Sequence, residues 1–359
     1  MNKITKLLSA LFLTALTFNF ATAQEVKLCS TTEMMNKYFN ENPSLKQAYL
    51  AEEQAAVLAD QIAFANGYKE GDGKSMLPIY TIPVVFHILH EGGPENISDA
   101  QIFDEMRILN EDYRKLNADI SAVVPSFTSI AADCEIQFAL AKKDPLGNCT
   151  NGIDRIYTSE TNVGDDDSKL NQWPRNKYLN VWVTKTISSG AAGYAYLPFS
   201  TVFAPENDGI VILSTYIGSI GSGSVTRSRA LTHEIGHYLN LNHTWGGTNN
   251  PEVDCSGSDA VSDTPTTAGH TSCNLSDADC NPPTIENVKN YMEYAYCSRM
   301  FTTGQKTRMR SALTSSTASR NNLWSAGNQT ATGLSTASVL CLANFESNDV
   351  LNVVCQGDS

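Results

Sequence analysis

The spacing of apolar positions changes several times along the chain, and each change predicts a different element. Residues 7–18 are almost continuously apolar, residues 79–90 are apolar and β-branched, and from residue 98 apolar positions recur every three or four residues. These patterns are typical of a targeting segment, a buried strand and a one-sided helix. Strand-like runs follow at residues 134–141, 178–184 and 208–213. This order predicts an α+β domain with a mixed twisted sheet backed by a helix.

Two details sharpen this prediction. The helix is expected to begin at Ser98, with Gln101 completing a capping box. The segment from Gly193 to Tyr196 lies just before Pro198. Because Pro is tolerated at the edge of a sheet, this segment is either an edge strand that could align an extended substrate, or an ordinary meander strand.

The first apolar run predicts export. Lys3 and Lys6 precede it, and the small side chains of residues 21–23 follow it, as in a signal-peptide cleavage site. A membrane anchor would need about 20 apolar residues, and this run is shorter. We therefore expect a signal peptide at residues 1–23, a secreted protein in the extracellular space or at the cell surface, and no membrane span.

The charge and the cysteines narrow the possible partners and the compartment. The formal net charge is −13, and removing Lys3 and Lys6 with the signal peptide changes it to −15. This acidic balance, with no cluster of basic residues, argues against nucleic acid and anionic membranes as partners. Nine cysteines in an exported chain predict disulfides and leave one thiol over.

Three histidines and a glutamate occur together at His233, Glu234, His237 and His243. On a helix, His233 and His237 lie one turn apart and face the same ion, while Glu234 beside them reaches a water molecule rather than the ion. A straight helix would carry the third histidine about 9 Å farther along its axis. We therefore expect a sharp helix end at Asn240, because Asn readily adopts the left-handed conformation.

Three neutral imidazoles leave one position on zinc open, which is typical of a catalytic site. The predicted reaction is hydrolysis of peptide bonds in proteins or peptides, with Glu234 as general base.

A surface helix that carries three histidines by chance is the simplest alternative to this metal site. A short-motif site with Glu286 or Glu293 as third ligand is another, although His243 makes it unnecessary. A third is an inactive secreted binding or adhesion module, which would be expected to lack Glu234 or a ligand.

With NYMEY at residues 290–294 and MFTTGQ at residues 300–305, the histidine motif resembles the metzincin metallopeptidases, and specifically the pappalysin or cytophagalysin family. The resemblance covers roughly residues 79–315. It implies a catalytic domain with a mixed upper sheet, backing and active-site helices, and a smaller disulfide-stapled lower subdomain after His243. Asn240 departs from the Gly of the family motif.

The resemblance also implies roles for single residues. Met292 would form the Met-turn under the metal. Tyr294 would stabilise the reacting oxyanion, with a packed aromatic ring as the alternative. Cys29 resembles the cysteine of a propeptide switch and would bind zinc in the latent form, with an idle or intermolecular thiol as the alternative.

Cys297 stands where relatives that cleave at Arg or Lys carry an acidic S1′ residue, so a preference for basic residues is not expected. The P1′ preference and the oligomeric state stay open.

Calcium and disulfides follow from the same resemblance. The acidic loop at residues 254–265 would bind a structural calcium ion, with a solvated loop as the alternative. Its expected ligands are Asp259, the Val261 carbonyl, Asp263 and Thr264. Spacing alone does not decide the disulfides, but family precedent pairs Cys255 with Cys280 and Cys273 with Cys297. The local pairs Cys134–Cys149 and Cys341–Cys355 then leave Cys29 free.

These predictions divide the chain into four parts. Residues 41–67 are rich in helix formers, and the Gly- and Lys-containing stretch at residues 68–76 is expected to be exposed and open to proteolysis. We therefore expect a propeptide at residues 24–75 and a catalytic domain at residues 76–320. Residues 321–359 are expected to form a linker followed by the first strands of a PKD-like or Ig-like module.

Overall fold

The computed structural model describes residues 27–65, 78–247, 250–335, 341–343 and 353–355. The predicted signal peptide at residues 1–23 lies outside this part of the chain. No helix in the described ranges is long and apolar enough to cross a membrane.

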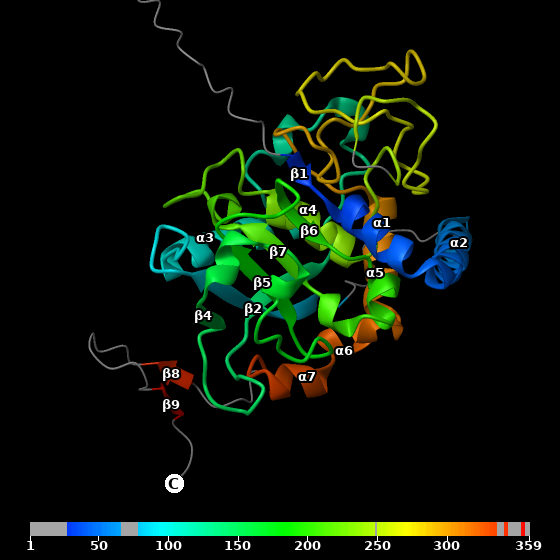
Figure 1. Ribbon diagram of the computed structural model, residues 1–359. Coiled ribbons are helices and arrows are strands. Elements are labelled where there is room, and N and C mark those ends of the chain that lie inside the picture. Colours follow the sequence, from blue (N-terminus) through cyan, green and yellow to red (C-terminus); the bar gives the residue numbers. More distant parts are fainter. Residues whose placement is uncertain (1–26, 66–77, 248–249, 336–340, 344–352, 356–359) are drawn as a thin grey trace, which may run out of the picture.

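A seven-stranded mixed sheet forms the centre of the fold (Figure 1). Its order is β1-β6-β7-β5-β2-β3, and β4 also pairs with β2. Only β6 and β7 pair in the antiparallel sense. The strands are β1 (Lys27–Cys29), β2 (Tyr80–His90), β3 (Ile136–Leu140), β4 (Ile153–Tyr157), β5 (Leu179–Thr184), β6 (Ala191–Ala195) and β7 (Ile210–Leu213).

The long strand β2 explains the continuous apolar run in the sequence. It pairs with β5 on one side, and on the other side with β3 through its first half and with β4 through its second half. Nearly all of its residues are buried, because both faces of the sheet are covered. The strands at β2, β3, β5 and β7 confirm the predicted positions, whereas the strand β4 was not predicted.

Three longer helices of the catalytic part pack around this sheet: α3 (Asp99–Tyr113), α4 (Ala230–Tyr238) and α5 (Thr303–Thr314). The Ser98 hydroxyl accepts a hydrogen bond from the Gln101 amide at 3.2 Å, as expected for an N-cap. The Gln101 side chain instead donates to the carbonyls of Ser214 and Ile217. The predicted capping box is therefore only half formed, because the Gln101 Oε1, which would accept from the Ser98 amide, accepts from the Ser222 amide at 3.2 Å instead. Short 3-10 helices lie at Ile120–Ala122, Pro125–Phe127, Ser159–Asn162, Asp166–Ser168, Pro198–Val202, Pro205–Asn207, Ser214–Tyr216 and Thr317–Ser319.

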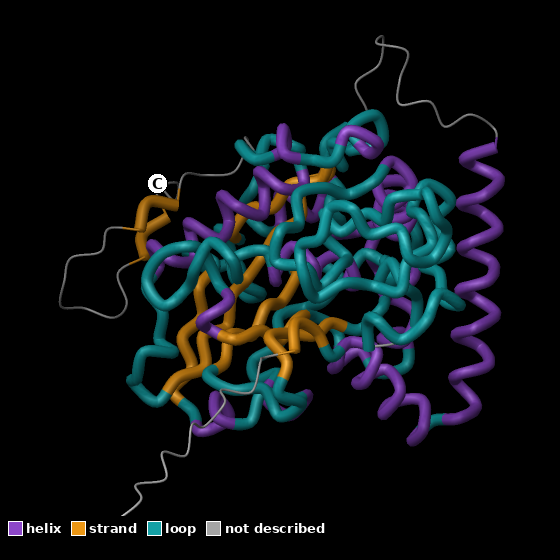
Figure 2. Tube along the Cα trace, turned by 90° about the horizontal axis from the view of Figure 1, so that it is seen from above, coloured by secondary structure: helices purple, strands orange, loops and turns teal. Residues whose placement is uncertain are grey.

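Two helices precede the catalytic part. The helix α1 (Thr31–Glu41) buries Met34, Met35 and Phe39, and the longer α2 (Pro43–Ala65) lies along one side of the molecule (Figure 2). Helical structure was predicted for the α2 region only. The strand β1 and the helix α1, which bring Cys29 onto the sheet, were not predicted.

Two short helices, α6 (Arg320–Leu323) and α7 (Ala326–Ala331), follow where the sequence predicts a linker. Trp324 stacks on Tyr80 with ring centroids 4.0 Å apart, and Gln329 donates to the Thr81 carbonyl. These contacts join the segment to the beginning of β2. Farther on, β8 (Cys341–Ala343) and β9 (Val353–Cys355) form an antiparallel pair. The predicted Cys341–Cys355 disulfide lies outside the side chains that the structure describes.

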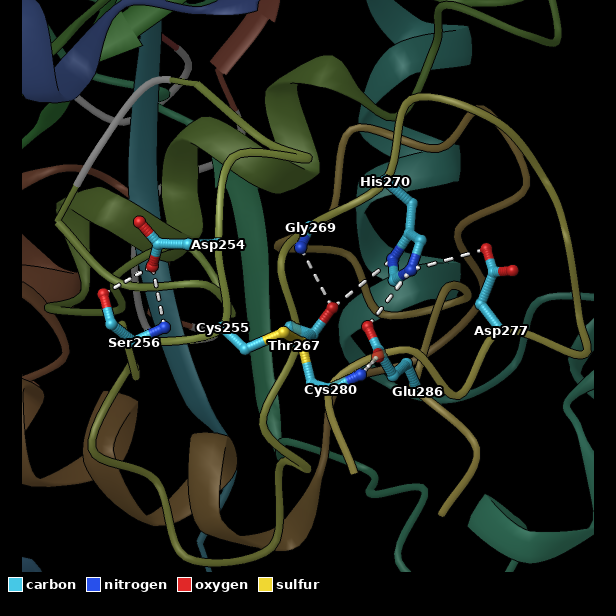
Figure 3. The surroundings of a disulfide bond; sticks show 9 residues. All are labelled: Asp254, Cys255, Ser256, Thr267, Gly269, His270, Asp277, Cys280 and Glu286. Carbon is cyan, nitrogen blue, oxygen red and sulfur yellow. Dashed lines mark hydrogen bonds and ion pairs between the residues drawn. A yellow bond between two sulfur atoms is a disulfide. The ribbon is translucent and has the colours of Figure 1, made fainter. Parts of the chain in front are cut away.

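Disulfides hold the loops that follow the active-site helix. Cys255 bonds to Cys280 and Cys273 bonds to Cys297, as predicted; Figure 3 shows the first of these bonds. The predicted Cys134–Cys149 pair is wrong, because Cys134 is a free buried thiol and Cys149 is engaged in a different disulfide. Cys134 precedes β3 and Cys149 follows it. A five-residue strand of roughly 17 Å separates them, beyond the reach of a disulfide.

Candidate active site

The active-site helix α4 ends sharply after its second histidine. The helix is buried along its whole length and ends at Tyr238. Asn240 has a φ of 73°, and the Leu241 amide donates back to the Gly236 carbonyl at 2.9 Å. This left-handed turn confirms the prediction for Asn240. It reverses the chain and brings His243 back to the helix.

The three imidazoles converge through their Nε2 atoms. The Nε2 of His237 lies 3.2 Å from the Nε2 of both His233 and His243. The Nδ1 atoms of His233 and His237 donate to the carbonyls of Tyr291 and Leu241 at 2.7 Å, so the free lone pairs are on Nε2. Burial lowers the pKa of His233 to about 4, which keeps this imidazole neutral.

Glu234 lies beside the histidines in a closed environment. It is fully buried, and burial raises its pKa to about 8 despite hydrogen bonds from Cys29 and Thr31. One carboxylate oxygen, Oε1, has no hydrogen-bond partner. A Cβ at Gly193 would lie 3.0 Å from the Glu234 Cγ, so a larger residue on strand β6 would press on the Glu234 side chain.

Cys29 completes the cluster from the far end of the chain. Its Sγ lies 3.5 Å from the His237 Nε2 and 3.6 Å from the Glu234 Oε2. The ligand atoms of Cys29 and the three histidines all lie within 4.8 Å of one another, and all four residues are buried. A thiol and three imidazoles are the donors that a tetrahedral zinc ion prefers, so these residues fit the metal.

The segment around Met292 lies under and beside this cluster. Met292 is fully buried, and a Cβ at Gly236 would lie 2.4 Å from its Sδ. The Tyr294 hydroxyl donates to the Cys29 carbonyl at 3.1 Å, and its ring packs against His243. Both residues therefore lie where the sequence predicted them, next to the histidines.

Several neighbours of the site were missed from the sequence. Trp245 stacks on His243 with ring centroids 4.5 Å apart, and Thr31 donates to Glu234 at 3.3 Å. Gly236 is needed for contact with Met292. Only Gly236 gave a local signal, as a glycine inside a helix between two ligands.

The two glutamates considered as alternative ligands lie elsewhere. Glu286 and Glu293 both contact His270, at 3.2 Å and 3.4 Å; Figure 3 includes His270 with Glu286 and Asp277. Burial alone would lower the pKa of His270, but the neighbouring carboxylates raise it above its usual value. This cluster is separate from the three converging histidines.

The candidate calcium loop is arranged around Asp259. Its Oδ1 accepts hydrogen bonds from the Val261 amide and the Thr264 hydroxyl, while its Oδ2 is buried without a partner. Burial raises the pKa of Asp259 to about 7. Asp263 instead accepts hydrogen bonds from the Thr302 hydroxyl and the Gly304 amide, at the beginning of α5.

Cys297 carries no charge into the site. It is bonded to Cys273 and is 5% exposed, among Val288 and Ala295. Cys297, the position where the resemblance implies an acidic residue in relatives that cleave at Arg or Lys, is therefore half of a disulfide.

The fold and the converging histidines define a metzincin-type zinc metalloendopeptidase, and comparisons with known proteins agree. A family profile described as "Pregnancy-associated plasma protein-A" matches residues 162–314. The chain belongs to this family, the pappalysins. An extracellular metalloprotease of Neurospora crassa is 31% identical over 278 residues, which cover 73% of this chain and 81% of that protein. One from Pyricularia oryzae is 29% identical over 274 residues, 72% of this chain and 83% of that protein.

Solved structures of mirolysin from Tannerella forsythia are similar in both fold and sequence. Mature mirolysin in complex with a cleaved peptide has a TM-score of 0.66 and 35% identity, and the match covers 72% of this chain and 99% of that chain. A promirolysin variant has a TM-score of 0.68 and 31% identity, covering 82% of this chain and 96% of that chain.

Proposed function

We propose that this chain is the precursor of a secreted zinc endopeptidase in which His233, His237 and His243 hold the metal and Glu234 is the general base. The observation that carries this proposal is the convergence of three imidazole Nε2 atoms beside a buried carboxylate. The names of the fungal relatives as extracellular metalloproteases support export.

When bound by the three histidines, zinc polarises the scissile carbonyl and acidifies a water molecule. Glu234 takes a proton from the attacking water and later delivers it to the leaving amine. The Tyr294 hydroxyl donates to the Cys29 carbonyl in the precursor, and in the mature enzyme it would donate to the substrate oxyanion instead. Met292 packs beneath the active-site helix and keeps the ligands in position.

The test uses the full chain activated by limited proteolysis between residues 66 and 77, beside a Glu234→Gln variant. The activated protein should cleave a diverse peptide mixture. This activity should be lost after treatment with a chelator and restored by added zinc. The Glu234→Gln variant should still bind one zinc ion but should not cleave. Stoichiometric zinc without cleavage by the wild-type protein would favour the inactive binding module.

We also propose that residues 24–75 keep the enzyme latent, with Cys29 as a fourth zinc ligand. The strand β1 pairs with β6, with Cys29 opposite Gly193, so it covers the strand to which an extended substrate would add. The match to promirolysin covers more of this chain than the match to the mature enzyme, which supports a propeptide in this region.

The calcium ion is the last part of this proposal. The unpaired Asp259 Oδ2 and the nearby Val261 carbonyl and Thr264 hydroxyl are oxygen donors of the kind that calcium prefers. Added calcium should raise the thermal midpoint of the wild-type protein and leave that of Asp259→Asn unchanged. An equal response of both proteins would argue against a site at this loop.

A further inference from the structure

A cavity of about 820 Å³ opens beside the catalytic residues. One wall is formed by residues 225–233, which lead into α4, and the other by residues 291–298. His233 and Tyr294 both line the cavity, so it begins at the reacting centre. Leu28 of β1 also lines it, so the proposed propeptide covers part of this space in the precursor.

The direction of β1 indicates which substrate residue the cavity receives. The strand β1 runs parallel to β6, and Leu28 precedes Cys29 at the catalytic cluster. A substrate that adds to β6 in the opposite, antiparallel sense reverses this order. The residue that follows the scissile bond then lies where Leu28 lies, and its side chain enters the cavity.

Two of the charged groups that line the cavity, Arg229 and Glu293, are already held by partners within the protein. The Arg229 guanidinium contacts both carboxylate oxygens of Asp112 at 3.2 Å and both of Asp119 at 2.8 and 2.9 Å. Glu293 is fully buried and accepts hydrogen bonds from the Thr244 hydroxyl and the His270 amide. Neither group is available to a substrate.

Arg227 also lines the cavity, but unlike Arg229 it is not held by carboxylates of the described residues. It is exposed, and its guanidinium lies over the ring of Tyr216, 5.2 Å from the centroid. No carboxylate in the described ranges forms an ion pair with it. Ala230, the first residue of α4, lines the same cavity, so the positive end of the helix dipole adds to this charge. With Cys297 held in a disulfide, the acidic side chain among the residues that line the cavity is Glu293, which is buried and already hydrogen-bonded.

From these observations we propose that the enzyme prefers Asp or Glu at P1′ and that Arg227 is the residue that selects it. A carboxylate in the cavity gains a charge-assisted hydrogen bond from Arg227, whereas a basic side chain meets repulsion. This inference rests on the proposed peptidase function and specifies its substrate class.

The test compares the activated full chain with Arg227→Gln, Arg227→Lys and Arg227→Glu on a peptide library randomised on both sides of the cleaved bond. Cleavage before Asp or Glu should exceed cleavage before Gln by about two- to fivefold in kcat/KM, the range of an exposed charge pair. Arg227→Gln should remove this ratio, Arg227→Lys should keep most of it, and Arg227→Glu should shift the preference to Lys and Arg. Arg107→Gln, which removes an exposed positive charge on α3, is the matched control and should keep the ratio.

Different outcomes would contradict the proposed peptidase function and the proposed role of Arg227. A wild-type protein that cleaves no peptide in the presence of zinc would contradict the proposed function itself. Efficient cleavage with an apolar or basic P1′ preference, an acidic preference at P1 instead of P1′, or a ratio unchanged in Arg227→Gln would contradict only the role of Arg227.

Discussion

Replacing Cys29 with Ala in the full chain tests how the precursor is kept inactive. The thiol is fully buried and lies among the imidazoles. A structural zinc site with four ligands is worth about 10–16 kcal/mol, so one ligand contributes roughly 3 kcal/mol. This corresponds to about a hundredfold change in the population of the open precursor.

Other contacts still hold the segment in Cys29→Ala. Met34, Met35 and Phe39 are each about 5% exposed. Burial of side chains of this size stabilises docking by about 2 kcal/mol each, or roughly 6 kcal/mol together. The intact variant should therefore cleave a small fluorogenic peptide about a hundredfold faster than the intact wild type, but more slowly than the activated enzyme.

The assay measures initial rates on precursor whose integrity is checked by electrophoresis. Phe39→Ala is the matched control, because it weakens docking by a similar amount, about 3 kcal/mol, without removing a metal ligand. In cobalt-substituted protein, a thiolate charge-transfer band should disappear in Cys29→Ala and persist in Phe39→Ala. If Cys29→Ala stays as latent as the wild type while Phe39→Ala becomes active, the thiol does not hold the enzyme latent.

Three further predictions follow from buried contacts. Gly236→Ala places a Cβ against the Met292 sulfur and should lower stability by about 1–3 kcal/mol; an unchanged denaturation midpoint would contradict this. The raised pKa of His270 means that its carboxylate partners stabilise the folded protein below the unfolded pKa, and that this stability is lost as pH rises through the folded pKa. His270→Asn should therefore reduce the fall in denaturation midpoint that the wild type shows as pH rises from the unfolded pKa of histidine through the raised folded pKa. Parallel wild-type and variant curves would refute this prediction. Asp208→Asn leaves the fully buried Arg320 without its bidentate partner and should cost about 3–5 kcal/mol in chemical denaturation; a loss below 1 kcal/mol would argue against this pair.

The metal cluster was largely predictable because it is local in sequence. The spacing of His233, His237 and His243 requires one helix and one sharp turn, and a single residue, Asn240, determines where that turn falls. The strands at β2, β3, β5 and β7 were predictable for a similar reason, because each is a largely apolar run bounded by polar residues.

Contacts between distant segments were not predictable. The three-residue strand β1 has no hydrophobic pattern of its own, and it is a strand because the edge of β6 accepts it. Thr31 reaches Glu234 across 203 residues of sequence, and no local signal indicates this contact. Cys134 was paired wrongly because spacing along the chain does not show that β3 holds it away from Cys149.

The pairing of β1 with β6 has a consequence for which proteins the mature enzyme can attack. Loss of β1 would leave the outer backbone groups of β6 to be satisfied by the substrate, which must offer a stretch of fully extended main chain. Folded domains rarely expose such a stretch, because their backbone groups are already bonded within helices and sheets. The rate at which a folded protein is cleaved should then follow how often its chain opens locally, so that loops, termini and partly unfolded proteins are consumed first.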